Sequence, residues 1–348
     1  MTEHPLSPTA ALPPDEAEET TELYEHHHLT VDKGQAPQRM DQFLAVRLAG
    51  ISRNKVQLAA KAGCILVNGK ATKSSYKVKP QDEIRVLLPT PPRHIELVPQ
   101  EMPLDIVYED GDVLVVNKPA GLVVHPGVAN FDGTLLNGLL FHLKDDPETS
   151  PYLVHRIDKD TSGLLLVAKN EAAQIDLAKQ FFDHSTERKY LALAWGDMGQ
   201  DDGTVDANLD RDPRDRRLRA VVEAPQGKHA VTHWHVLRRL GYVTLIECVL
   251  ETGRTHQIRA HLRHIGHPLF SDAPYGGDRI LKGTTFSKYR AFVENCFRLL
   301  PRQALHAAVL GFRHPATRQW LHFEAPMPAD MAAVVARWAT YAEASTQK

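Results

Sequence analysis

The chain has 348 residues, of which 43% are hydrophobic and 24% are charged, and its net charge is −2. Its three cysteines are far apart, odd in number and without a CxxC pair, which argues against a disulfide framework or a structural zinc site. No apolar stretch approaches membrane-spanning length, and the N-terminus lacks a basic region followed by an apolar one. The sequence therefore predicts a soluble, cytoplasmic protein.

The charge is distributed unevenly along the chain. Residues 1–28 contain seven acidic residues and no Lys or Arg, which leaves 36 acidic and 41 basic residues elsewhere, a net charge of +5. Such a modestly basic body permits a polyanionic partner without requiring one. Residues 1–35, which are rich in Pro, Glu, Thr and Ala and lack periodicity, are predicted to form a disordered acidic tail.

A compact basic unit is predicted over residues 38–86. Two short helices come first, the second with Ser52 as its N-cap, and Asn68-Gly69 then gives a strong signal for a β-hairpin. The basic side chains of the unit form either a solubilising surface or a contact surface for RNA phosphates. The candidate RNA-binding residues are Arg39, Arg53, Lys55 and Lys70.

Several segments of this unit resemble the small helix-helix-hairpin RNA-binding module of the S-four-like type. They are Arg39–Leu44, Ser52-Arg53, Val67–Lys70 and Asp82–Ile84. By itself, this resemblance implies RNA binding and no chemistry.

A second domain is predicted over residues 102–345. The proline-rich residues 87–101 before it are expected to form a stiff linker. The domain alternates β-prone runs with helical patterns, which indicates a strand-dominated α+β fold. One helix after Asn170 is expected to have an apolar face of Ile175, Ala178 and Phe182, widened by Leu177 and Phe181. Further strands are expected at 105–109, 113–116, 164–168, 190–195 and 242–250, a charged loop at 201–228, and helices at 135–140, 254–263, 282–300 and 329–341.

A dense polar cluster, His155–Gly163, runs directly into an apolar run that is predicted to be a buried strand. The cluster therefore occupies a loop at the end of a core strand, where a rigid scaffold holds reactive groups. Asp158 is flanked by Arg156 and Lys159, and these cations favour an ionised carboxylate that is available as a nucleophile or base. An ordinary surface turn is the alternative, and composition alone favours it.

The sequence lacks several common enzyme signatures, namely GxxxxGK[ST], GxGxxG, GxSxG and HExxH. His256 and His261 do not share a helical face and lie among arginines, which argues against a metal site. A carboxylate in a cationic loop, a tyrosine at a strand edge and an Arg-rich helix suit a cofactor-free reaction at a sugar or base of a polyanion.

Three of these stretches, His155–Leu165, Arg188–Tyr190 and Glu251–Arg259, resemble the signature blocks of the RluA-type pseudouridine synthases. One departure is Ile157, which stands where the family usually has Leu. With the preceding RNA-binding module, the chain is most similar to the RluD branch, which acts on large-subunit ribosomal RNA. Further blocks in the same order are Asn117–Pro119 with Gly121, His125-Pro126 and Leu305–Ala307.

The resemblance implies a mixed, mainly antiparallel sheet and a reaction that converts uridine to pseudouridine without metal or cofactor. Asp158 would be the catalytic aspartate, acting either on the anomeric carbon or on a ribose proton. Tyr190 would stack on the uracil and take the proton from its carbon five, and Arg259 would pair with Asp158. The candidate substrate-binding residues are Arg156, Thr161, Arg254, His256, Gln257 and Leu305.

Two other functions stay open on the sequence. One is an RNA-binding or ribosome-assembly protein with an inactive synthase domain, against which the intact Asp158, Tyr190 and Arg259 argue. The other is a nucleoside or glycoside hydrolase, which needs a second carboxylate such as Asp160 close by. The expected partner is large-subunit ribosomal RNA or its assembly precursor, and the absence of an exposed apolar stripe predicts a monomer.

Overall fold

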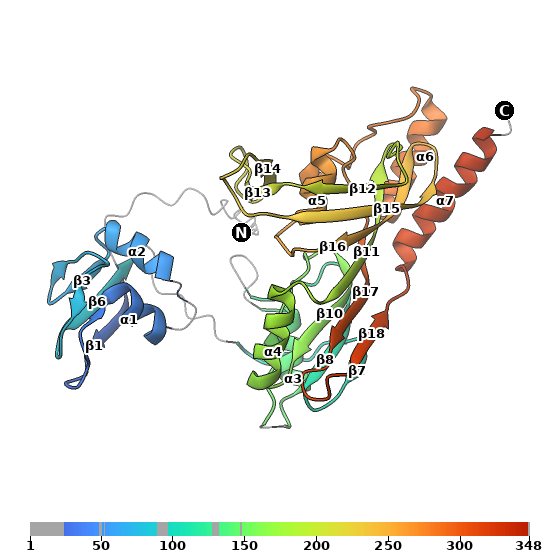
Figure 1. The fold of residues 1–348 in the computed structure, drawn as a ribbon. Coiled ribbons are helices and arrows are strands. Elements are labelled where there is room, and N and C mark those ends of the chain that lie inside the picture. The colour runs from blue at the N-terminus through green and yellow to red at the C-terminus, as the bar shows by residue number, and fades with distance from the viewer. Residues whose placement is uncertain are drawn as a thin grey trace, which may run out of the picture. The chain divides into compact units, whose positions relative to one another are not determined.

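The computed structural model describes residues 24–48, 51, 53–88, 97–126, 132–146 and 148–346. The chain divides into two compact units, Met1–Ile95 and Glu96–Lys348. Figure 1 shows a small N-terminal unit and a larger unit built around one long sheet.

The N-terminal unit packs two helices on a small antiparallel sheet. The predicted hairpin is confirmed: β3 and β4 pair across Asn68 and Gly69, whose φ angles of 51° and 79° fit the left-handed conformation that such a tight turn needs. The helices pack on the sheet through fully buried side chains, including Met40 and Leu44. The elements are β1 (Tyr24–Thr30), β2 (Gln38–Arg39), α1 (Met40–Arg47), α2 (Arg53–Lys61), β3 (Ile65–Val67), β4 (Lys70–Ala71), β5 (Lys77–Val78) and β6 (Glu83–Leu88).

The limits predicted for the tail and the linker are partly wrong. Residues 87 and 88 of the predicted linker belong to β6. Residues 24–30 form β1, which pairs with β6, and Val31 is buried, so the tail does not extend to residue 35. The physical reason is that Leu29 and Val31, two residues apart, both pack into the core of this unit. A largely polar segment can therefore pair with the edge of β6. Residues 1–23 and 89–96 lie outside the described part of the chain.

The larger unit contains a long, mostly antiparallel sheet in the order β12-β15-β16-β11-β17-β10-β8-β7. One neighbouring pair, β10 and β17, is parallel and is joined by only two residue pairs, Ser162 with His306 and Gly163 with Ala307. The strands are β7 (Ile106–Glu109), β8 (Val113–Lys118), β9 (Tyr152–Leu153), β10 (Ser162–Ala168), β11 (Glu187–Trp195), β12 (Asp202–Asp206), β13 (Asn208–Arg211), β14 (Arg219–Val222), β15 (Val231–Arg239), β16 (Val243–Leu250), β17 (Leu305–Arg313) and β18 (Trp320–Glu324).

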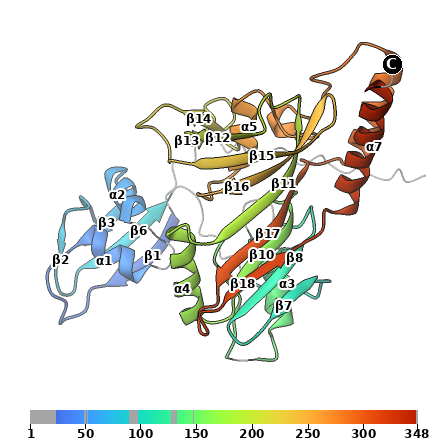
Figure 2. The same cartoon turned by 45° about the vertical axis from the view of Figure 1, so that its right-hand side comes forward.

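Helices cover both faces of this sheet, as Figure 2 shows. Alternate residues of a strand point to opposite faces, so Leu114 packs with α3 while its neighbour Val115 packs with α4. On the same principle, α5 shares the face of α3, and α6 and α7 share the face of α4. The helices are α3 (Leu135–His142), α4 (Glu171–Phe182), α5 (Gln257–His264), α6 (Ser287–Leu299) and α7 (Ala329–Thr346).

Two predictions within this unit are partly wrong. Helix α4 forms where expected and buries Leu177, with Phe181 packed partly against the same cluster, but Ile175 and Phe182 are 71% and 81% exposed, and Ala173 completes the buried face. The predicted loop 201–228 contains β12, β13 and β14, because its charged side chains alternate with a few buried ones. Among the described residues, no helix is long and apolar enough to cross a membrane.

Candidate active site

The loop that carries Asp158 is fixed at the point where it enters β10. Gly163 has a φ of 114°, and a Cβ atom added there would lie 2.2 Å from the carbonyl oxygen of Ala307 in β17. Only glycine accepts both this backbone conformation and this close approach of two strands. The strand after the loop is therefore locked against its parallel neighbour.

Two buried cations hold the carbonyl groups that follow Asp158. The Lys118 Nζ atom donates to the carbonyl oxygen of Lys159 at 2.8 Å, and to those of Pro119 and Leu122 at 2.8 and 2.9 Å. Burial lowers the pKa of Lys118 to about 7, against the opposing charge of Asp160. The three carbonyl oxygens favour the ammonium form, because only that form has three N–H donors.

The second of these cations is Arg302, which lies just before β17. Its Nη1 atom donates to the carbonyl oxygen of Asp160 at 3.0 Å, and its Nε and Nη2 atoms bind the carboxylate of Asp330 at 2.8 and 2.9 Å. Asp330 lies in the first turn of α7, so this bidentate pair connects the C-terminal helix to the loop of Asp158.

Asp158 forms the predicted ion pair with Arg259. The Arg259 Nη1 atom donates to the Asp158 Oδ2 atom at 3.0 Å, and its Nε and Nη2 atoms both bind Asp272 at 2.8 Å. Asp272 is fully buried, whereas the Asp158 side chain is 17% exposed. Burial opposes the charge of Arg259, but the hydrogen bonds and charge of Asp272 and the charge of Asp158 raise its pKa. The guanidinium is thus permanently charged and fixed in orientation.

His256 lies on the other side of the same carboxylate. Its Nε2 atom is 3.9 Å from the Asp158 Oδ2 atom, and its Nδ1 atom is 3.0 Å from the hydroxyl of Tyr275. A left-handed φ of 54° at His256 starts α5 and turns the imidazole towards the loop. Burial lowers the pKa of His256 against the opposing charge of Asp158, which favours the neutral imidazole near pH 7.

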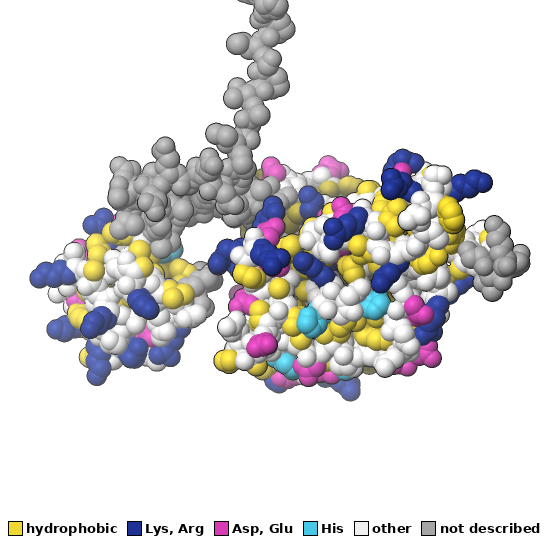
Figure 3. All heavy atoms as spheres, turned by 90° about the horizontal axis from the view of Figure 1, so that it is seen from above, with side chains coloured by type: hydrophobic (Ala, Val, Ile, Leu, Met, Phe, Trp, Pro, Cys, Tyr) yellow, Lys and Arg dark blue, Asp and Glu magenta, His cyan; other side chains and the backbone are white. Residues whose placement is uncertain are grey.

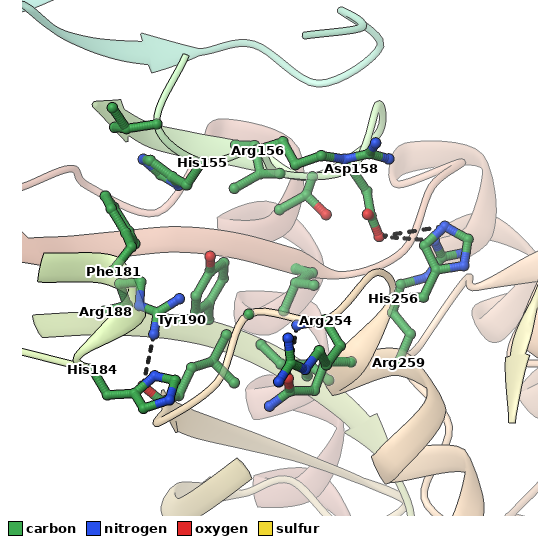
Figure 4. Close-up of a pocket in the computed structure, with 18 of the residues that line it drawn as sticks. His155, Arg156, Asp158, Phe181, His184, Arg188, Tyr190, Arg254, His256 and Arg259 are labelled. Carbon is green, nitrogen blue, oxygen red and sulfur yellow. Dashed lines mark hydrogen bonds and ion pairs between the residues drawn. The ribbon is translucent and has the colours of Figure 1, made fainter. Parts of the chain in front are cut away.

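Asp158, Tyr190 and Arg259 line one pocket of about 410 Å³, which adjoins a hollow of about 1010 Å³ that Asp158 and Arg259 also line. Figure 4 shows Asp158, His256 and Arg259 at one end of this pocket, and Phe181, His184 and Arg188 at the other. Tyr190 is 8% exposed, and burial raises its pKa, so the phenol stays protonated near pH 7.

The other predicted substrate-binding residues all line this pocket but differ in what they offer to a ligand. Arg156 and Arg254 are exposed, and Leu305 forms a buried part of the wall. Gln257, by contrast, uses both ends of its amide group within the protein. Its oxygen accepts hydrogen bonds from Thr252 and Arg254, and its nitrogen donates to Val231 and Thr232. The hydroxyl of the buried Thr161 contacts Gln303. The contacts of Gln257 and Thr161 therefore support a structural role and argue against the predicted substrate-binding role.

In the N-terminal unit, Arg39 and Arg53 both donate to the buried Asp41, at 3.0 and 3.1 Å, yet their side chains are 41% and 49% exposed. Lys70 is exposed on the hairpin, and the side chain of Lys55 lies outside the described part of the structure. Lys and Arg side chains are spread over the face of this unit that Figure 3 presents.

Sequence reasoning missed Asp272 and Arg302, and it gave no role to Lys118 or Arg188, although both stand within blocks that resemble the family's signatures. Asp272 lies 13 residues after Arg259, and Arg302 lies 142 residues after Asp160. No spacing rule connects such positions. The available signal is local: Lys118 ends the apolar strand β8, and Asp272 comes two residues after the apolar pair Leu269-Phe270, where an unpartnered charge is costly.

Among the described residues, one cluster has the composition of a metal site: Asp110, Asp112 and His314. The His314 Nδ1 atom accepts hydrogen bonds from the backbone N–H groups of Ala316 and Thr317, which places the ring proton on Nε2. That Nε2–H group donates to Asp110 at 2.9 Å. Because a protonated nitrogen cannot bind a metal, the cluster is a hydrogen-bonded turn.

Comparison with known proteins places this site in a family. A family model for RNA pseudouridylate synthase matches residues 112–264, and a model for the S4 domain matches residues 38–84. An uncharacterized RNA pseudouridine synthase, YlyB of Bacillus subtilis (strain 168), is 45% identical over 311 residues, which are 88% of this chain and 96% of that protein. The ribosomal large subunit pseudouridine synthase D of Zymomonas mobilis is 43% identical over 301 residues, 84% of this chain and 91% of that protein.

A solved structure shares the fold. The human protein named RNA Pseudouridylate Synthase Domain Containing 4 has a TM-score of 0.52 at 24% identity, over 67% of this chain and 92% of that chain. The larger unit therefore has the fold of a pseudouridine synthase. This chain belongs to the RNA pseudouridine synthase family and is an RNA-modifying isomerase with an N-terminal S4 domain.

Proposed function

We propose that this synthase converts specific uridines of large-subunit ribosomal RNA to pseudouridine, with Asp158 as its catalytic carboxylate and without a cofactor. The Asp158–Arg259 ion pair, in a pocket that Tyr190 also lines, is the observation that supports the proposal most directly. The choice of RNA is supported by relatives from Zymomonas mobilis and Neisseria meningitidis that are named ribosomal large subunit pseudouridine synthase D.

The reaction exchanges one bond to the ribose for another. The bond from uracil N1 to the anomeric carbon breaks, the base turns, and C5 bonds to that carbon, while C5 loses a proton and N1 gains one. Both routes for Asp158, attack on the anomeric carbon or removal of a ribose proton, need an ionised carboxylate with one oxygen free. Arg259 holds the Oδ2 atom, and the Oδ1 atom has no partner among the described residues.

Tyr190 is assigned to stacking on the extruded uracil. The ring is held by the sheet at the pocket wall, and stacking offsets part of the cost of removing a base from its stack. Removal of the C5 proton by Tyr190 would first require an ionised phenol, which burial disfavours. We therefore propose stacking as the main role of Tyr190.

We also propose that residues 38–86 form an RNA-binding module and residues 102–345 the catalytic domain. The half-exposed guanidinium groups of Arg39 and Arg53, together with exposed Lys70, would contact RNA phosphates. Holding both arginines on Asp41 reduces the side-chain entropy that is lost on binding.

The test uses unmodified large-subunit RNA that carries tritium at C5 of its uridines. The wild-type enzyme is expected to release tritium, and Asp158→Asn is expected to lower the rate by at least about a thousandfold while leaving the melting temperature unchanged. Dialysis against EDTA is expected to leave the wild-type rate unchanged. Substantial activity in Asp158→Asn would contradict the assignment, and free uracil among the products would favour a hydrolase.

A further inference from the structure

Arg188 is the buried cation of the pocket that the proposed reaction does not use. It lies in β11, two residues before Tyr190, and is 6% exposed. Its Nη2 atom donates to the carbonyl oxygens of Leu250 and Glu251 at 3.4 and 3.0 Å. Among the described residues, the Nε atom has no hydrogen-bond partner, and no acceptor is found for Nη1.

No carboxylate of the described chain neutralises this guanidinium. Glu251, whose backbone carbonyl accepts from Arg188, pairs its side-chain carboxylate with the His233 Nε2 atom at 2.6 Å instead. Burial lowers the pKa of Arg188, which reflects the cost of keeping a charge at this position. A buried cation without an anion is unfavourable, so a ligand that brings an anion would remove the cost.

The unpaired part of the guanidinium is accessible from the pocket at one point. Gly253 lines the pocket, and a Cβ atom added there would lie 2.8 Å from the Arg188 Nη1 atom. Gly253 does not have a positive φ, so backbone conformation does not require glycine there. The missing side chain therefore leaves Nη1 uncovered.

The surroundings of Arg188 suit a nucleotide. Phe181 stacks with the guanidinium at 5.4 Å, and Phe182, also in the pocket lining, is 81% exposed. His155 is kept neutral, because burial and the charge of Arg188 lower its pKa to about 3. This end of the pocket is thus cationic and aromatic, a combination found where proteins bind single-stranded RNA.

We infer that Arg188, uncovered at Gly253, binds a phosphodiester group of the RNA adjacent to the extruded uridine. The inference rests on the proposed function for the identity of the RNA. One oxygen of the phosphate would accept a charge-assisted hydrogen bond from Nη1, the nitrogen that faces Gly253 and the pocket. Arg188 would thereby set the position of the RNA backbone while Asp158 acts at the other end of the pocket, as seen in Figure 4.

The experiment is phosphate-ethylation interference on an unmodified full-length transcript of large-subunit ribosomal RNA. Ethylation neutralises phosphates at random, and bound and unbound RNA are then separated and mapped for the wild type and Arg188→Gln. The wild-type map is expected to contain one strong position that is lost in Arg188→Gln. The slope of log affinity against log salt is expected to fall by about one.

Two further variants separate binding from folding. Lys189→Gln removes the same charge from the neighbouring residue, which pairs with Glu187 and Glu247 outside the pocket, and should give the wild-type map. Gly253→Ala keeps Arg188 but covers Nη1, and should lose the same position as Arg188→Gln. Thermal melts of all the variants control for folding.

Identical maps for the wild type and Arg188→Gln would overturn the inference and would leave the proposed function intact. Identical maps are what would be seen if Arg188 bound a uracil carbonyl group and no phosphate, because ethylation changes only phosphates. A lost position without any pseudouridine formation would support the phosphate site and contradict the proposed function. Failure of the wild type to bind the transcript would overturn both.

Discussion

Each of the two units contains an aspartate that is paired with arginine, but the two carboxylates differ in burial and in the number of hydrogen bonds they accept. Asp41 is fully buried and accepts four hydrogen bonds, two from Arg39 and one each from Arg53 and Gln57, at 2.7 to 3.1 Å. These bonds, chiefly those of Arg39, hold the pKa of Asp41 well below its usual range. Within the described part of the chain, the Asp158 carboxylate accepts a single hydrogen bond, from Arg259, and it is partly exposed to a pocket.

The difference separates a structural carboxylate from one that is free to react. At Asp41 both oxygens are occupied, so its charge serves to hold two helices and two arginines together. At Asp158 the second partner of Arg259 is another acid, Asp272, and the Oδ1 atom of Asp158 has no partner among the described residues. The reactivity proposed for Asp158 therefore depends on the small number of donors around its carboxylate, and an arginine partner alone does not predict it.

The largest effect on stability is expected at Asp41. Asp41→Asn removes the charge from a buried acceptor of four hydrogen bonds and turns an amide donor towards the donors of Arg39 and Arg53, so the N-terminal unit should lose about 3–5 kcal/mol of its free energy of unfolding. Urea denaturation followed by circular dichroism measures this loss. The rate at saturating RNA should stay near that of the wild type, and a large fall in that rate would break the comparison.

Asp272 is the next test, because it serves stability and catalysis together. Asp272→Asn removes the anchor of Arg259 and should cost about 3 kcal/mol of stability. It should also lower kcat about tenfold to a hundredfold, because Arg259, once released from residue 272, no longer holds Asp158 in one orientation. Asp278→Asn, which changes an exposed acid nearby, should change neither quantity. A stable and fully active Asp272→Asn would contradict this role.

Arg302 is expected to have a smaller effect that is confined to kcat. It contacts the carbonyl oxygen of Asp160 and lies outside the lining of the Asp158–Tyr190 pocket, so it acts through the loop. Arg302→Gln should lower kcat about tenfold and leave KM for RNA within about twofold. Steady-state kinetics over a range of RNA concentrations separates the two constants. A change in KM alone would assign Arg302 to RNA binding.

The smallest effect concerns pH. The His155 Nε2 atom accepts the backbone N–H of Leu166, and burial lowers its pKa from 6.5 to about 3. Between these values the unfolded chain binds the proton and the folded chain does not, so stability is lost as pH falls through this window. From pH 7 to pH 5 the contribution is about 1 kcal/mol after allowance for partial exposure. His155→Gln keeps an acceptor without titrating, and its unfolding free energy should therefore depend less on pH.

Local patterns predicted much of the fold but not the orientation of its parts. The hairpin at Asn68-Gly69 needs a backbone conformation that few residues adopt, and its position was predictable for that reason. Helix α4 was predicted, but its buried face was predicted only in part, because Leu177 is buried while Ile175 and Phe182 are exposed. Leu177, Ala178, Phe181 and Phe182 form an apolar stripe too wide to define one face, and contacts with the sheet decide which side is buried.

The candidate site was predictable only in part, and through resemblance to a family. Asp158 and Arg259 are 101 residues apart, and no periodicity connects them. Lys118 and Arg302 act on backbone carbonyl groups, which have no sequence signature at all. Asp272 and Arg188 are both buried charges, but Asp272 pairs with Arg259, whereas Arg188 has no carboxylate partner among the described residues. Which of two buried charges has a partner depends on the completed fold.

The two-pair junction between β10 and β17 has a consequence for how the enzyme varies. The two strands are paired through only two residue pairs, so their spacing depends on this short contact. A larger residue in place of Gly163 would meet the carbonyl oxygen of Ala307 at 2.2 Å and push the strands apart, so this position tolerates no added side chain without a shift of the backbone.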